Sequence, residues 1–189
     1  MKKNTIVQFV CFSTTLELED FTPEWERYAK RLTNKKAGSN LQQLVVETKN
    51  RYRYISQHEW PNRDFHFTFM DERKSEHFPG YNVKVVQAGG YIPLRQYKRL
   101  TGKGQDNDVS LIALIGHAEN DIEFYNQLPY YHRLNIYQAF FESCLYGYIL
   151  EFQVPENHAD ELLHHLQQRP SVETGIYREC LLSLLKPVF

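Results

Sequence analysis

The sequence predicts an α+β protein made of two tandem ferredoxin-like units, each with the element order β-α-β-β-α-β. Three observations predict this fold. The hydrophobic pattern gives the same order of strands and helices on both sides of a polar stretch. A length of 189 residues suits two small domains. The residues of one predicted strand and of the turn after it also occur twice. Tyr52, Tyr54, Ile55 and Pro61 recur at the same spacing as Tyr146, Tyr148, Ile149 and Pro155.

The first half supplies the complete set of elements once. Strands are predicted at residues 5–13, 41–48, 51–60 and 83–94, and helices at residues 21–32 and 62–78. Thr22 is the expected cap of the first helix, and Pro23 is expected at its first position. Lys49-Asn50 is the expected turn of the hairpin between the second and third strands.

The second half repeats this order after a linker. Residues 95–107 are polar and lack periodicity, which predicts a linker between a first unit at 1–94 and a second at 108–189. Strands are predicted at residues 108–117, 134–143, 145–154 and 174–184, and helices at 119–128 and 156–169. The local pattern around residues 129–144 also suits a helix, and the repeat favours a strand there.

Composition excludes several classes of function. The formal net charge is −1 and no basic block occurs, which argues against binding to nucleic acid or to an anionic membrane. The three cysteines are far apart and form no C-x-x-C pair, so we expect no disulfide framework and a reducing, cytoplasmic setting. The N-terminal apolar run is too short to span a bilayer.

Strand alternation sorts the third predicted strand by face. Tyr52, Tyr54, Ser56, His58 and Trp60 share one face. Such a row could hold a planar aromatic ligand, with His58 as a general base, since imidazole titrates near neutral pH. The alternative is that the row is core packed against the other half.

The histidine spacing argues against a metal site. His66 and His77 could approach His58, but none of these three forms an i, i+4 pair and no H-E-x-x-H occurs. His164 and His165 are adjacent, so they diverge by about 100° on a helix. We therefore expect no metal, and nothing in the sequence demands a cofactor.

The hairpin strand ending in "QHEWPN" carries a resemblance to a known family. Together with the element order, Glu59-Trp60 resembles the dimeric α+β barrel superfamily, closest to the antibiotic-biosynthesis-monooxygenase-like proteins. The resemblance implies two antiparallel sheets packed face to face as a barrel, with a pocket between helices and sheet in each unit. Its members include cofactor-free monooxygenases and haem-degrading enzymes. At the positions typical of the haem-degrading branch this sequence has Gln8, Phe69 and a displaced His77, which departs from that branch.

These observations lead to two hypotheses for function. The first is a small-molecule-binding, cofactor-free monooxygenase-like enzyme acting on an aromatic or polyketide-like substrate. The second is a non-catalytic ligand-binding or scaffold protein of the same fold with no open active site. Under the first, the catalytic candidates are His58 and His66, and the substrate-binding candidates are Tyr52, Tyr54, Trp60 and Phe69. The sequence leaves open whether two chains associate as a homodimer.

The two halves differ where the predicted site lies. His58, Glu59 and Trp60 of the first half become Phe152, Gln153 and Val154 in the second. The sequence therefore predicts that any site lies in the first half.

Overall fold

The computed structural model describes residues 5–34, 38–44, 52–72, 83–99, 108–118, 121–169 and 172–180. Helices and strands follow the predicted order. The first half contains β1 (Ile6–Thr14), α1 (Leu18–Asn34), β2 (Gly38–Leu44), β3 (Tyr54–Trp60), α2 (Arg63–Glu72) and β4 (Val83–Lys98). The second half contains β5 (Asp108–Ile115), α3 (Phe124–Gln127), β6 (Arg133–Ala139), β7 (Tyr148–Pro155), α4 (Glu156–Gln167) and β8 (Val172–Glu179).

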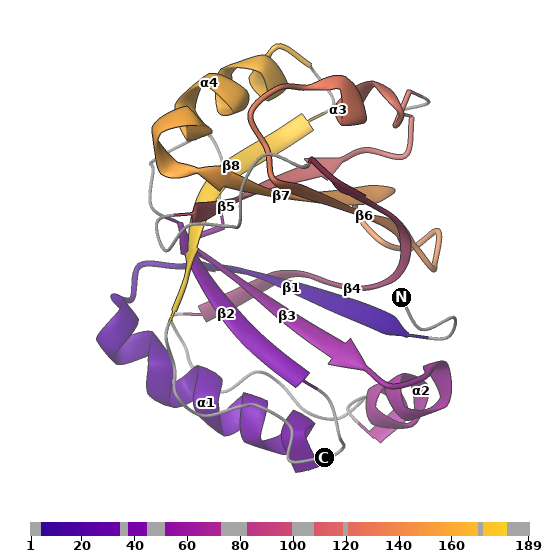
Figure 1. Ribbon diagram of the computed structural model, residues 1–189. Coiled ribbons are helices and arrows are strands. Elements are labelled where there is room, and N and C mark those ends of the chain that lie inside the picture. Colours follow the sequence, from indigo (N-terminus) through magenta and orange to yellow (C-terminus); the bar gives the residue numbers. More distant parts are fainter. Residues whose placement is uncertain are drawn as a thin grey trace.

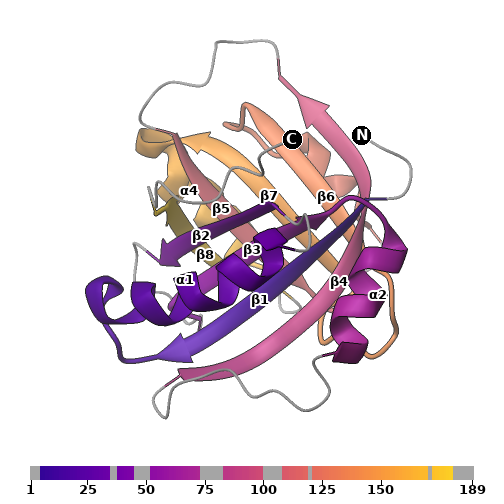
Figure 2. The same cartoon turned by 90° about the horizontal axis from the view of Figure 1, so that it is seen from below.

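The eight strands close into one antiparallel barrel in the order β1-β3-β2-β8-β5-β7-β6-β4. The long strand β4 closes one side, because it pairs with β1 and then continues along β6. The pairing of β2 with β8 closes the other side. The helices lie outside the barrel, α1 and α2 against the first half and α3 and α4 against the second (Figure 1). Figure 2 shows α1 and α2 lying across the outer face of β1 to β4.

Side-chain alternation along the strands produces three hydrophobic clusters. The barrel interior holds Val7, Phe9, Cys11, Tyr52, Ile55, Tyr91, Ile112, Leu114, Tyr137, Cys144, Tyr146, Ile149 and Tyr177. The space beneath α1 holds Val10, Phe12, Phe21, Trp25, Ala29, Leu41 and Tyr54. A third cluster packs α3 and α4 against the second half. The barrel is therefore filled by side chains, and the helices cover separate outer cores.

The first helix begins earlier than the sequence predicted. It starts at Leu18, so Thr22 lies inside it and its hydroxyl donates a 2.6 Å hydrogen bond to the Leu18 carbonyl. Pro23 also lies inside the helix. The prediction of a cap at Thr22 was wrong because Leu18 and Phe21 both pack in the cluster beneath the helix, which draws an extra turn onto the sheet.

The expected linker is in part a strand. Arg95, Gln96, Tyr97 and Lys98 continue β4 and pair with β6 after an irregularity between Pro93 and Arg95. These polar residues form a strand because the backbone of β6, in the other half, supplies their hydrogen-bond partners. The rest of the expected linker, from residue 100 to 107, lies outside the described residues.

Other boundaries also differ from those predicted. The helix expected at 119–128 is the single turn of α3, and the strand expected to reach residue 143 ends at Ala139. The turn expected at Lys49-Asn50 and the candidate His77 lie outside the described residues. Among the described helices, none is long and apolar enough to span a bilayer.

The repeated tyrosines meet inside the barrel. The hydroxyl groups of Tyr52 and Tyr146 share a hydrogen bond, and their rings pack edge to face with centroids 6.4 Å apart. The backbone carbonyl of each of these two tyrosines also accepts a hydrogen bond from another tyrosine, on β8 or β4 of the opposite half. Tyr177 donates to the carbonyl of Tyr52, and Tyr91 donates to the carbonyl of Tyr146, both at 3.2 Å. Each half therefore donates a tyrosine hydroxyl to a tyrosine carbonyl of the other half.

Candidate functional site

A cavity of about 280 Å³ lies where α2 and β4 of the first half meet the β6–β7 connection of the second. We call it the His66 cavity. Its lining is largely apolar and contains few polar side chains. The lining residues are Gln8, His66, Phe67, Ala88, Gly89, Gly90, Phe141, Ser143 and Cys144. A mostly apolar cavity with a few polar side chains is typical of a small-molecule site.

His66 is the distinctive group in this cavity. Its side chain is only 2% exposed, and neither ring nitrogen has a hydrogen-bond partner among the described residues. Its ring packs edge to face against Trp60, with centroids 5.6 Å apart. Burial lowers the pKa of His66, because desolvation disfavours the imidazolium form. A neutral imidazole in an apolar cavity can accept a proton or a hydrogen bond from a bound molecule.

Gly90 makes room for the imidazole, and the preceding Gly89 makes room for the Tyr91 ring. A Cβ atom added at Gly90 would lie 3.2 Å from His66 Cε1 and 3.5 Å from His66 Nε2. A Cβ atom added at Gly89 would lie 2.9 Å from Tyr91 Cε2. Consecutive glycines inside a strand often mark a close approach, so "AGGY" in β4 was the available sequence signal for this site. The sequence prediction did not use it.

An aromatic wall borders the cavity on the side of the β6–β7 connection. The Phe67 ring from α2 lies 5.7 Å from the Phe141 ring and 6.0 Å from the Phe140 ring. The Arg63 guanidinium lies over the Phe140 ring, 4.6 Å from its centroid. These contacts bring the second half to a site that the sequence had placed in the first half alone.

Cys144 lines the same cavity without the properties of a nucleophile. Burial raises the pKa of its thiol, which keeps it protonated at neutral pH. Its sulfur points to the carbonyl of Gly90 at 3.8 Å, a weak donor contact. Cys144 therefore shapes the cavity wall beside the imidazole.

His58, the first catalytic candidate, does not line the His66 cavity. It is fully buried, and its Nε2 lies 2.8 Å from Ser56 Oγ while its Nδ1 lies 2.8 Å from Ser39 Oγ. Ser56 Oγ also accepts a 2.8 Å hydrogen bond from the Trp25 indole of α1. The structure thus gives His58 the place of a satisfied core residue beneath α1, because its face of β3 points to the helix.

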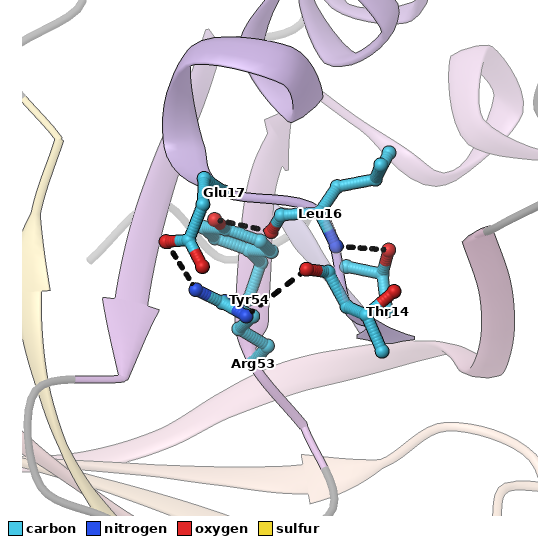
Figure 3. Close-up of polar contacts among 6 residues, drawn as sticks. Thr14, Leu16, Glu17, Arg53 and Tyr54 are labelled. Carbon is cyan, nitrogen blue, oxygen red and sulfur yellow. Dashed lines mark hydrogen bonds and ion pairs between the residues drawn. The ribbon is translucent and has the colours of Figure 1, made fainter.

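Tyr54 occupies the same outer core. Its ring stacks on Phe21, with centroids 4.2 Å apart and an interplanar angle of 4°. Its hydroxyl donates a 3.1 Å hydrogen bond to the carbonyl of Leu16 (Figure 3). The neighbouring Arg53 pairs with Glu17 and donates to the carbonyl of Thr15. Figure 3 shows these contacts joining β3 to the β1–α1 connection, so Tyr54 holds that connection and does not line the His66 cavity.

The remaining substrate-binding candidates are dispersed. Tyr52 precedes β3 and lies inside the barrel against Tyr146, so it leaves the face that alternation had assigned to it. Trp60 stays on that face and meets His66. Phe69 lies in α2, and its side chain is outside the described part of the structure. Of the six predicted residues, the structure brings together His66 and Trp60.

The described residues offer no group of metal ligands, and the His66 cavity does not fit haem. No group of three or more His, Cys, Asp or Glu side chains among them could hold a metal ion. Haem is the cofactor that the family resemblance raises. The His66 cavity of about 280 Å³ is below the size typical of drug-sized ligands, and its described lining contains no Lys or Arg for the two propionates. A tetrapyrrole does not fit this lining.

Comparisons with known proteins identify the fold. No protein-family model matches the chain, and no curated protein matches it. Among solved structures, an anthrone oxidase-like protein aligns over 97% of this chain and 96% of its own, at a TM-score of 0.62 and 12% identity. A point mutant of chlorite dismutase from Candidatus Nitrospira defluvii aligns over 94% of this chain and 92% of its own, at a TM-score of 0.58 and 10% identity. These neighbours have the dimeric α+β barrel fold.

Proposed function

We propose that this protein binds a small aromatic molecule in the His66 cavity and oxidises it with dioxygen, without a cofactor. The observation that carries the proposal is the imidazole of His66, which has no hydrogen-bond partner among the described residues and lies in a largely apolar cavity. An acidic hydroxyl or C–H group of a ligand would supply the contact that the imidazole lacks among the described residues. The aromatic wall of Phe67 and Phe141 suits a planar ring.

The chemistry needs one base and a site with little water. His66, neutral because burial lowers its pKa, removes a proton from an activated methylene carbon next to an aromatic ring. The resulting carbanion forms a C–O bond to dioxygen, and the imidazolium returns the proton to give a hydroperoxide. The second C–H proton is then lost, the O–O bond breaks and water leaves, so the methylene becomes a carbonyl. One dioxygen is consumed and one water is formed for each molecule oxidised.

One neighbouring structure supports an oxidation of this kind, because it is described as an anthrone oxidase-like protein. An aromatic ketone with an acidic methylene group, such as anthrone, matches both the cavity and the base. Trp60 would position the imidazole by its edge-to-face contact.

The experiment follows anthrone oxidation by dioxygen uptake and by the absorbance of the quinone product. The wild type should turn over, and His66→Phe should lower the rate at least about 100-fold, since general bases contribute this much or more. Glu24→Gln is the control, because this side chain lies on α1 and pairs with Arg27. Equal rates for wild type and His66→Phe would overturn the assignment of the base.

A non-catalytic ligand-binding protein is the second candidate. It is favoured by the many large aromatic side chains that fill both the barrel and the outer cores. Under this function, anthrone would bind the wild type and perturb the fluorescence of nearby Trp60, with no product formed. Binding without turnover would therefore select the second candidate over the first.

We also propose that the fold consists of two repeated units. Two tandem ferredoxin-like units, with a boundary in the 95–107 segment, are supported by the repeated element order and by the reciprocal tyrosine contacts. A homodimer stays a prediction, which the mass in solution tests.

A further inference from the structure

A second cavity, of about 150 Å³, opens at one mouth of the barrel. It is lined by Thr5, Val7, Gln57, Glu59, Pro93, Arg95, Gln96, Asn135, Ile136 and Tyr137. None of these residues lines the His66 cavity. We call it the barrel-mouth cavity. Unlike the His66 cavity, most of its lining side chains are polar.

A buried carboxylate lies behind the wall of this cavity. Glu151 is only 6% exposed, and it accepts hydrogen bonds from Asn135 Nδ2 at 2.9 Å and from the Tyr137 hydroxyl at 3.2 Å. A third, long bond of 3.4 Å comes from Gln42 Nε2. Burial, and next the charge of Glu151, raise the pKa of Tyr137, so its hydroxyl keeps the proton that it donates.

This carboxylate sets the direction of the hydrogen bonds around it. An ionised carboxylate only accepts, so Asn135 must turn its NH₂ group inward and its carbonyl oxygen toward Gln96. Gln96 therefore donates its Nε2 to Asn135 Oδ1, at 2.7 Å. Tyr137 donates inward as well, so its oxygen accepts from Gln57 Nε2 at 3.4 Å. Each of these bonds uses one N–H of Gln57 or Gln96, and the side-chain carbonyl oxygens of both residues have no hydrogen-bond partner among the described residues.

Gln42 shows the same effect on the buried side. Its NH₂ group also points to Glu151, and its Oε1 is buried with no hydrogen-bond partner among the described residues. A buried acceptor without a partner is costly, so the carboxylate dominates the orientation of the nearby amides. The lining of the barrel-mouth cavity thus offers the carbonyl oxygens of Gln57 and Gln96 and the carboxylate of Glu59 as acceptors.

The charges at the mouth also favour a cation. Glu59 lies at the mouth and forms no ion pair with any described residue, whereas the rim residue Arg95 is held by Glu123 and Tyr97. Arg133 lies two residues before Asn135 on β6. Its positive charge lowers the pKa of Tyr137, which opposes the effect of the negative charge of Glu151 on the same hydroxyl. Within the described structure, the carboxylate of Glu59 is therefore available to pair with a bound cation.

We propose that the barrel-mouth cavity binds a small primary ammonium compound. The ammonium group has three N–H donors and no acceptor, which complements the carbonyl oxygens of Gln57 and Gln96 and the carboxylate of Glu59. The volume of about 150 Å³ suits a compound with a short alkyl chain, which would lie against Val7 and Pro93. This site does not depend on the proposed oxidation at His66.

The experiment titrates the full chain with n-propylammonium chloride, n-propanol and sodium propionate, using calorimetry and side-chain amide NMR signals. Propylammonium should bind and shift the amide signals of Gln57 and Gln96, and the neutral and anionic probes should not. Glu59→Gln should weaken binding about tenfold, as expected for loss of a charged hydrogen bond. Glu59 is exposed, so this change should leave folding intact.

Two control variants make the result specific. Glu24→Gln removes a charge on α1 and should bind propylammonium as tightly as the wild type. His66→Phe should also bind it normally, which separates this site from the His66 cavity. The proposal is overturned if propanol binds as tightly as propylammonium, or if Glu59→Gln and Glu24→Gln bind equally well.

Discussion

Replacement of His66 by phenylalanine tests the central feature of the candidate site. The imidazole is buried, and both of its nitrogens lack hydrogen-bond partners in the described structure. A buried unsatisfied polar group costs about 1–3 kcal/mol. A phenyl ring keeps the edge-to-face contact with Trp60, and the adjoining cavity accommodates its larger ring. We therefore expect His66→Phe to raise the free energy of unfolding at pH 7.5 by about 1 kcal/mol.

The same substitution should change how stability depends on pH. Burial lowers the pKa of His66 in the folded state below its ordinary value of 6.5. As the pH falls through 6.5, the unfolded chain therefore binds the proton before the folded chain does, and the wild type loses stability. The variant lacks this proton uptake. Its advantage over the wild type should grow between pH 7.5 and pH 5.5.

Urea unfolding of both proteins at these two pH values, followed by tryptophan fluorescence, measures the effect. His58→Phe is the matched control, since this imidazole is equally buried but bonded through both nitrogens to Ser39 and Ser56. It should lose about 2–4 kcal/mol, because both hydrogen bonds of the imidazole are lost and a larger ring enters a packed core. If His66→Phe loses as much stability as His58→Phe, the imidazole of His66 has polar partners in the folded protein. That result would refute its assignment as an unsatisfied group beside the His66 cavity.

Three further substitutions test other parts of the structure. Gly90→Ala places a Cβ 3.2 Å from His66 Cε1, so it should block ligand binding in the His66 cavity, and undiminished affinity in a titration would contradict this. Glu151→Leu removes an acceptor from three donors and should cost about 3 kcal/mol or more in thermal unfolding, whereas an unchanged midpoint would refute the network. Trp25→Phe should cost about 1 kcal/mol in urea unfolding through the lost bond to Ser56, and no change would show that bond to be negligible.

Local patterns predicted the elements better than their ends. The order of strands and helices followed from hydrophobic periodicity, and it is the order observed. Arg95–Lys98 read as a linker because they are polar, yet β6 supplies their hydrogen-bond partners. Thr22 had the character of a helix cap, and packing of Leu18 and Phe21 extended the helix past it. In both cases a contact distant in sequence outweighed the local preference.

The candidate site was predicted in part. His66 and Trp60 were named from the sequence, and the structure places them in contact. His58 was named because it shares a strand face with Trp60, but alternation could not tell a face covered by a helix from one that lines a cavity. Phe141 and Cys144 were missed, because they reach the cavity through the β6–β7 connection of the other half.

Periodicity and composition are local properties, so they were enough to predict the mixed α+β class, the repeated element order and the chemical types of side chain present. Long-range contacts distinguish the histidine with hydrogen-bond partners from the one without any among the described residues. Hydrogen bonding and burial depend on groups far apart in the chain, as for His58 beside Ser39 and His66 beside Gly90. The barrel also turned Glu151 inward, where one carboxylate orients the side-chain amides of Gln42 on β2 and Asn135 on β6. Closure of the sheets made that arrangement, and no segment of the chain encodes it alone.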